Sequence, residues 1–273
     1  MGWVWERTKS IAWYTEIFFH YGSQYLKSKM TYRADFIINV FSDFFLQSMN
    51  LIFILVLFDH IPVLKGWSRE EMMFIYGFFL IPFGFYSGFF NHLFDVPEKY
   101  VIQGELDRVL VRPMNSLFQV IVETMRLELV FGVFVGLAVM VYAAEKMNLT
   151  WSWWDIPLGM MLATGATFIY GGVYTLLASL GFWFEGRMGL MPLVYNISNY
   201  GRYPADIYKG VVRFILTWIL PFAFTGFYPA TVLMKREEYY YFGLLTPVVG
   251  LVFWAFSYFV WTQGIKRYRG TGS

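Results

Sequence analysis

Residues 36–58 read FIINVFSDFFLQSMNLIFILVLF, a run whose single charged side chain is Asp43. A helix that crosses the hydrocarbon core needs about 20 mostly apolar residues, because every backbone amide must find its partner inside the segment. The rest of the chain has the same character: 58% of its residues are hydrophobic and 15% are charged, where a soluble domain carries about 25% charged residues. We therefore predict an integral membrane protein.

Five further stretches are apolar enough to cross a bilayer. They cover residues 72–94, 129–144, 156–184, a segment that starts near residue 211, and 243–262. The third is short, and we expect Arg126 and Glu128 beside it to extend toward the interface. The sequence therefore predicts an all-α, polytopic membrane protein with six transmembrane helices.

The basic residues are distributed unevenly between the connections. Of the 21 Lys and Arg residues, 16 fall on the side that carries both termini and 5 on the other side. Basic residues concentrate in cytoplasmic loops, so we expect both termini in the cytoplasm. The 16 are Arg7, Lys9, Lys27, Lys29, Arg33, Lys99, Arg108, Arg112, Arg126, Arg187, Arg202, Lys209, Arg213, Lys266, Arg267 and Arg269, and the 5 are Lys65, Arg69, Lys146, Lys235 and Arg236.

The segment before the first span has its own pattern. Trp13, Ile17, Tyr21 and Tyr25 recur at intervals of four, and lysines follow. This spacing predicts an amphipathic helix in the cytoplasmic interface, where Trp and Tyr are favoured; the alternative is a simple cytosolic tail. The expected organisation is a cytoplasmic segment 1–35, a transmembrane domain 36–264 with a cytoplasmic loop 95–123, and a tail 265–273.

Several classes of chemistry are excluded by residues that the chain lacks. There is no cysteine, so there are no disulfides or thiolate sites. The three histidines are far apart in sequence, which argues against a metal site. A net charge of +2 does not indicate nucleic-acid binding. No phosphate-binding glycine loop occurs, so any ATP must be bound by another chain.

The loop 95–123 contains the run VPEKYVIQGELDRVLVRPMNSLFQ at residues 96–119. Pro97 and Pro113 are suited to bound a short helix, with Gly104 as an interior weak point. On such a helix Leu106, Val109 and Leu110 share one face. We interpret the segment as a docking element; the alternative is an ordinary charged loop.

Three motifs resemble permease subunits of type-2 ABC exporters, in particular bacterial exporters of the daunorubicin and viologen kind. They are GELDRVLVRP at 104–113, YPADIYKGVVRFILTWILPFAFTGFYPA at 203–230 and FWAFSYFVWTQGIKRYRGTGS at 253–273. The resemblance implies a half-transporter of the bacterial inner membrane that exports a hydrophobic or amphipathic substrate. It also implies a second permease, identical or homologous, and two separate ATPase subunits that bind ATP and Mg, while this chain binds no cofactor.

In that family the loop between the second and third spans is the coupling helix that presses into the ATPase. Carried onto this chain, the role falls on Gly104, Glu105, Leu106, Asp107, Arg108, Arg112 and Pro113.

Within the first span, Asn39, Asp43, Gln47 and Asn50 lie along one helical face. Polar groups in hydrocarbon are costly, so this stripe should face protein or water. It either lines the translocation path or hydrogen-bonds neighbouring helices, and we favour the second role.

The predicted fifth span meets Pro221, Gly226 and Pro229, and a broken helix at membrane depth must be covered by protein or a cavity. The resemblance implies that the chain re-enters the membrane here, before the sixth helix. Thr217, Phe224, Thr225 and Tyr228 are then candidates to line the exit; the alternative is an ordinary kinked helix.

Two other stripes are interpreted as packing. Small residues recur every fourth position from Gly159 to Ser179, which favours close helix contacts. The aromatic residues Phe79, Phe83, Tyr86 and Phe90 recur at helical spacing, which is typical of core or lipid-facing surfaces.

Two other functions are weaker alternatives. An ion-coupled secondary transporter often shows paired broken helices, and here one span is clearly broken. An intramembrane lipid-modifying enzyme needs clustered acid, base or nucleophile groups, and Asp43 has no such neighbour at helical spacing.

Overall fold

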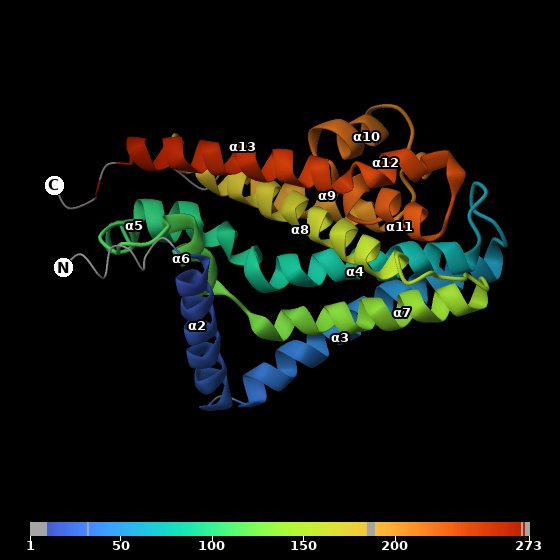
Figure 1. The fold of residues 1–273 in the computed structure, drawn as a ribbon, viewed down its shortest axis with the longest axis horizontal. Coiled ribbons are helices and arrows are strands. Elements are labelled where there is room, and N and C mark those ends of the chain that lie inside the picture. The colour runs from blue at the N-terminus through green and yellow to red at the C-terminus, as the bar shows by residue number, and fades with distance from the viewer. Residues whose placement is uncertain (1–9, 32, 185–188, 269, 271–273) are drawn as a thin grey trace.

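The computed structural model describes residues 10–31, 33–184, 189–268 and 270. Within these residues the chain is helical, and its only β-type pairing is an isolated bridge between Leu64 and Trp67. The all-α prediction is confirmed. Figure 1 shows long helices lying side by side in an elongated bundle. They are α3 (Arg33–His60), α4 (Arg69–Phe89), α7 (Gly132–Lys146), α8 (Asp155–Leu180) and α13 (Thr246–Arg267).

All five long helices are long and apolar enough to cross a membrane, α7 together with the 3₁₀ helix Leu127–Phe131 that precedes it. The bundle has two ends. The terminal end carries α2 (Ile11–Thr31) and the last turn of α13, and the far end carries the connections 61–68, 147–154 and 234–239.

Helix α4 forms the centre of the bundle, because 89% of its most apolar window is buried. Its aromatic stripe lies in the core: Phe79 stacks on Phe83 at 5.3 Å between ring centroids, and Tyr86 stacks on Tyr170 of α8 at 4.8 Å. Aromatic pairs at these separations add to the stability gained by burial. The packing interpretation of this stripe is therefore the one that the structure supports.

Helices α8 and α13 approach each other most closely through glycines outside the predicted small-residue stripe. A Cβ on Gly165 would lie 2.6 Å from the Cα of Pro247, and one on Gly172 would lie 2.9 Å from the carbonyl carbon of Phe253. Gly171, which belongs to the stripe, also faces α13, since a Cβ there would lie 2.8 Å from the ring of Trp254. Small residues therefore allow close helix packing here, with the closest backbone approach at the glycines beside the stripe.

The fifth crossing differs from the sequence prediction. It consists of α9 (Leu190–Ser198) and the 3₁₀ helices Asn199–Arg202 and Ala205–Ile207. At the terminal end, Tyr195 contacts the ring of Phe94. At the far end, the indole Nε1 of Trp67 donates to the Asp206 carboxylate at 2.9 Å. Residues 190–207 therefore run from the terminal end of the bundle to the far end. The prediction that places Arg202 and Lys209 on the side of the termini is wrong.

The apolar run that would have marked this crossing is missing from the sequence. Asn196, Asn199 and Arg202 interrupt it, and Gly201 and Pro204 break its helix. Position 201 has no room for a side chain, since a Cβ there would lie 2.5 Å from the carbonyl oxygen of Phe222. Because neighbouring protein covers the broken backbone, the segment can be irregular inside a membrane.

The segment predicted to be the fifth span is a re-entrant hairpin. Its first arm is α10 (Val211–Phe214) with the π-helix Ile215–Ile219, and its second is the 3₁₀ helix Phe222–Thr225 with α11 (Phe227–Leu233). The two arms meet at a bend of 65°. Asp206 before the hairpin and Arg236 after it both bind the far end, Asp206 through Trp67 and Arg236 through Glu71. The expected re-entrant element before the sixth helix is thus present, followed by α12 (Tyr240–Leu244).

This topology changes the assignment of three basic residues. Lys209 lies beside Asp206 and Arg213 lines a pocket with Phe242 of α12, so both belong to the far end, and Arg202 lies inside the bundle. Among the described residues, 9 Lys and Arg residues then lie at the terminal end and 7 at the far end. The bias keeps its direction but is smaller. Arg7, Lys9, Arg187 and Arg269 of the terminal-end set lie outside the described residues.

Candidate functional site

The 95–123 loop folds as several short helices at the terminal end. After α4 come the 3₁₀ helix Asn91–Asp95, the π-helix Val96–Ile102, α5 (Leu106–Leu110) and α6 (Ser116–Thr124). Gly104 has a φ of +78°, a left-handed conformation that glycine adopts without steric cost. Gly104, the expected weak point, separates the π-helix from α5, so the segment between Pro97 and Pro113 is not one continuous helix. Helix α5 contains Leu106, Val109 and Leu110, the residues expected to be helical.

The apolar side chains of this loop divide into an anchor and an exposed set. Leu106 and Val109 are fully buried and anchor α5 to the bundle. Leu110, predicted to share their face, is 41% exposed, and Val111 beside it is 82% exposed. Exposed apolar side chains on this loop are available for contact with a partner. We call Ile102, Leu110 and Val111, all three exposed, the apolar tip.

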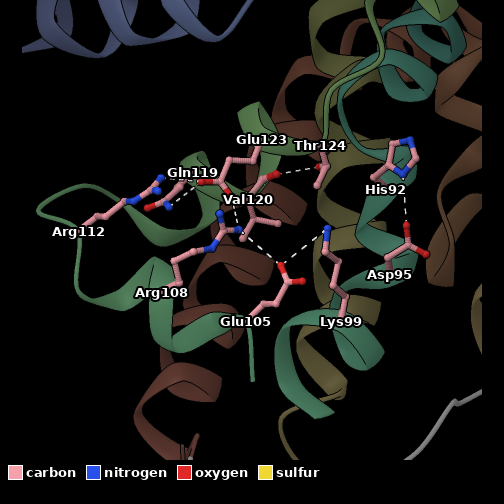
Figure 2. Close-up of polar contacts among 10 residues, drawn as sticks. All are labelled: His92, Asp95, Lys99, Glu105, Arg108, Arg112, Gln119, Val120, Glu123 and Thr124. Carbon is pink, nitrogen blue, oxygen red and sulfur yellow. Dashed lines mark hydrogen bonds and ion pairs between the residues drawn. The ribbon is translucent and has the colours of Figure 1, made fainter. Parts of the chain in front are cut away.

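Charged residues hold the loop in shape, as Figure 2 shows. The Glu123 carboxylate accepts from Arg112 Nη1 at 2.8 Å and from Arg108 Nη2 at 3.1 Å. Glu105 pairs with Arg108 at 3.5 Å and with Lys99 at 3.8 Å. Isolated surface ion pairs contribute about 0–1 kcal/mol each, but here several charges form one network. It fixes α5 relative to α6.

The amino-terminal helix α2 is attached to this loop, which the sequence did not indicate. Arg112 Nη1 donates to the Tyr21 hydroxyl at 3.1 Å, and the backbone N–H of Asn115 donates to the Tyr14 hydroxyl at 3.2 Å. Tyr21, one of the residues predicted to mark an interfacial helix, thus also binds the loop, and Tyr14 is a further contact that the pattern did not include. In Figure 1, α2 runs across the bundle axis, the direction expected of a helix in the membrane interface.

Glu128 differs from its expected position. Its side chain is buried, forms an ion pair with Lys29 Nζ at 3.1 Å and accepts a hydrogen bond from the Tyr25 hydroxyl. Burial, together with the neighbouring Glu128 carboxylate, raises the pKa of Tyr25 above its usual range. We expected Glu128 to extend toward the interface, but its side chain is buried under α2. Helix α2 supplies the cation Lys29 and the donor Tyr25 at the start of the third span.

The carboxyl-terminal helix also reaches the loop. Trp261 Nε1 donates to Ser116 Oγ at 3.1 Å, and the Asn115 side chain donates to the Tyr258 hydroxyl at 2.7 Å. Asp107 lies against the chain's own end, since a Cβ on Gly270 would lie 3.2 Å from its Oδ1. Asp107, predicted to contact an ATPase, therefore faces residues of this chain.

The polar stripe of α3 faces protein, as predicted. The Tyr76 hydroxyl of α4 donates to the backbone oxygen of Gln47 at 2.8 Å, and Gln47 Nε2 donates to Asp43 at 3.4 Å. Asn50 accepts a hydrogen bond from Arg202, and Asn39 is half-buried one turn before Asp43. Gln47 and Asn50 thus join α3 to α4 and to the fifth crossing, which favours a structural role over contact with substrate.

Arg202 is a residue that the sequence did not single out. It is 8% exposed inside the bundle, its Nε donates to the Asn199 carbonyl at 3.0 Å, and its guanidinium lies 5.3 Å from the ring centroid of Phe79. Among the described residues, no carboxylate lies within ion-pair distance of it. A buried cation of this kind is costly, and amides and an aromatic ring offset part of that cost.

The four candidates for the exit pathway are brought together by the hairpin. Thr217 Oγ1 lies 3.4 Å from the Tyr228 hydroxyl, and the rings of Phe224 and Tyr228 are 4.7 Å apart. Thr225 donates to the Phe222 carbonyl at 2.8 Å. All four are buried. Thr217 and Tyr228 join the two arms, whereas the contacts of Phe224 and Thr225 lie within the second arm.

Both flanks of the hairpin are attached to the beginning of α4. The Arg236 Nε donates to Glu71 Oε1 at 2.9 Å, and its guanidinium lies 4.7 Å from the Trp67 ring centroid. Glu71 also completes a capping box with Ser68, which stabilises the first turn of α4. The far end is thus closed by an ionic and aromatic cluster of Trp67, Glu71, Asp206 and Arg236.

Comparison with protein families gives one match that covers most of the chain. The model described as "ABC-2 family transporter protein" matches residues 44–272. No curated protein and no solved structure matches the chain. The matched residues contain the 95–123 loop, the fifth crossing and the re-entrant hairpin.

Proposed function

The chain belongs to the ABC-2 family of transporter proteins, and on that premise we propose that it is the transmembrane permease subunit of an ATP-driven exporter. It moves a hydrophobic or amphipathic substrate across the bacterial inner membrane. The ATP is bound and hydrolysed, with Mg, by two separate ATPase subunits. A second permease, identical or homologous, completes the pathway. Membrane-spanning helices without a nucleotide-binding motif support this division of labour.

The orientation that we propose puts the terminal end in the cytoplasm. The support is the excess of Lys and Arg at that end, which among the described residues is 9 against 7 at the far end. Basic residues are retained on the cytoplasmic side of membrane proteins. The 95–123 loop then faces the compartment where ATP is available.

The observation that carries the proposal is the apolar tip on a braced loop. Val111 is exposed to water, while the buried Leu106 and Val109 and the Glu123 ion pairs fix the backbone beneath it. A preorganised apolar contact surface binds a partner without a large cost for ordering the loop. We propose that the tip enters a groove of the ATPase.

The contacts divide the predicted coupling residues into two roles. Leu106, Glu105, Arg108 and Arg112 contact this chain and position the loop. Gly104 allows the reversal of the backbone, and Pro113 is exposed beside Val111. In the proposal, ATPase closure pushes on the tip, and the braced loop transmits the movement to α2 and α13.

Copurification with the ATPase tests the proposal. Val111→Asp puts a charge at the centre of the tip without removing a buried contact, so we expect the ATPase to be lost from the purified complex. Ser28→Asp, at an exposed position on α2, is the matched control and should retain it. If Val111→Asp keeps both the association and the transport-linked ATP hydrolysis, the coupling role is wrong.

A further inference from the structure

A cavity of about 600 Å³ lies between α2 and the 95–123 loop. The apolar tip does not line it, so it is distinct from the proposed contact surface for the ATPase. Its walls carry three cations, Lys99, Arg108 and Arg112, and one carboxylate, Glu123. The α2 side adds Tyr21, His20 and Gln24, whose side chains can form hydrogen bonds.

Among the residues that line the cavity, cations outnumber carboxylates by three to one. Lys99, Arg108 and Arg112 share the two carboxylates of Glu105 and Glu123. One positive charge therefore remains uncompensated among these five residues. The three cationic side chains are 38–51% exposed, and each keeps N–H groups beyond those used in the ion pairs. Guanidinium and ammonium groups held in this way are suited to a phosphate oxyanion.

The cavity lies at the level of the lipid headgroups. Phe19, Leu26 and Met30 form an exposed apolar face of α2, which must enter the boundary between headgroups and acyl chains. At 100° per residue, His20 and Gln24 lie on the adjoining polar face, and the cavity opens there. Figure 1 shows α2 crossing the bundle axis, the direction expected of a helix that lies in the membrane interface.

We propose that this cavity binds the phosphate-bearing headgroup of an anionic phospholipid. Basic pockets at the cytoplasmic side of transmembrane helices bind anionic headgroups through the same combination of charge and donors. The bound phosphate bridges Lys99 and the arginines of the loop to the polar face of α2. Its consequence for transport rests on the proposed function, because Arg108 and Arg112 brace the loop that carries the apolar tip.

Lipid retention by the purified full-length chain, measured by native mass spectrometry, tests the binding without an ATPase. The chain is equilibrated with equal amounts of phosphatidylglycerol and phosphatidylcholine, and we expect phosphatidylglycerol to be retained preferentially. Lys99→Glu and Gln24→Glu each place a negative charge in the cavity, and each should lower the preference by about fivefold or more, the effect of one basic residue near an anionic surface.

Lys27→Glu is the matched control, because Lys27 is exposed on α2 and does not line the cavity. The proposal is overturned if the two lipids are retained equally, or if Lys27→Glu reduces the preference as much as Lys99→Glu. Inorganic phosphate at millimolar concentration is the third arm. Should it displace phosphatidylglycerol completely, the site takes a free anion and the lipid assignment is wrong. None of these outcomes depends on the ATPase, so failure here is separate from failure of the proposed function.

Discussion

The indole of Trp67 donates a 2.9 Å hydrogen bond to the carboxylate of Asp206, a residue 139 positions later in the chain. Lys65 Nζ reinforces the contact by donating to the carbonyl oxygens of Asp206 and Ile207 at 3.3 Å. Because Trp67 immediately precedes α4 at the far end, this contact requires residues 190–207 to cross the bundle. It also requires the hairpin that follows to enter and leave on one side.

Single cysteines provide a direct test of this topology, because the chain has no cysteine of its own. A membrane-impermeant thiol reagent applied from outside the cell should label Lys209→Cys and Lys235→Cys. It should not label Lys266→Cys at the end of α13 until the membrane is permeabilised. If Lys209→Cys is labelled only after permeabilisation, Lys209 lies on the same side as the termini, as the sequence predicted, and the re-entrant hairpin is wrong.

The hairpin should tolerate no side chain at Gly226. A Cβ there would overlap the carbonyl oxygen of Gly201 and lie 3.1 Å from the Cβ of Phe79. We expect Gly226→Ala to destabilise the purified protein by about 1–3 kcal/mol, as overpacking does in cores. The measurement is thermal unfolding in detergent. Gly189→Ala is the control, since no atom lies within 4 Å of its Cβ position, and an equal loss in both variants would contradict the close contact.

Asn50 and Arg202 should be energetically coupled. Asn50→Leu deprives a buried guanidinium of an acceptor, and we expect a loss of about 1–3 kcal/mol. Arg202→Met removes the buried charge but leaves the Asn50 amide without that partner. The double variant should then be more stable than the sum of the two losses implies, with a coupling of about 0.5–3 kcal/mol. A double-mutant cycle of thermal stabilities measures it, and additive losses would mean that the two side chains do not interact.

His92 should make stability depend on pH. The second span ends at Phe89, so His92 lies beyond it. Burial of the His92 ring is the larger cause that lowers its pKa, and the nearby Arg126 cation is the next. Asp95, which faces the ring at 3.3 Å, offsets part of this effect.

The folded state therefore binds the proton less well than the unfolded state does. Stability should be complete above the ordinary histidine pKa of about 6.5 and fall as the pH drops below it. Melting temperatures measured between pH 8 and pH 5 check the direction. His92→Gln should flatten the decline, and a decline of unchanged size in that variant would assign it to another group.

The sequence predicted those elements whose evidence lies within one continuous segment of the chain. Continuous apolar runs identified α3, α4, α7, α8 and α13, because each must satisfy its backbone within one segment. The break at Pro221 was visible for the same reason. The fifth crossing was not, because a segment covered by other helices need not be apolar, and its side chains satisfy one another only after folding.

In the candidate site, too, some features were visible in the sequence and others arise only from the folded structure. The composition of the loop indicated a docking element, and the helical spacing of Asn39, Asp43, Gln47 and Asn50 indicated a protein-facing stripe. Val111 and Ile102 were missed because their exposure depends on the left-handed turn at Gly104. The attachment of Tyr21 to Arg112 joins residues 91 positions apart, and no pattern in one sequence encodes such a pair.

Helix α13 contacts the loop directly and is joined to the hairpin through α12. Near one end, Trp261 and Tyr258 bind α6; at the other, α12 leads into it, and Gly243 of α12 lies against Val232 and the backbone of Tyr228. Its 22 residues make a rod of about 33 Å at 1.5 Å per residue. In the orientation that we propose, this rod joins the cytoplasmic loop to the hairpin segment on the opposite side of the membrane. A displacement of the loop and a displacement of the hairpin can then be one movement of α13.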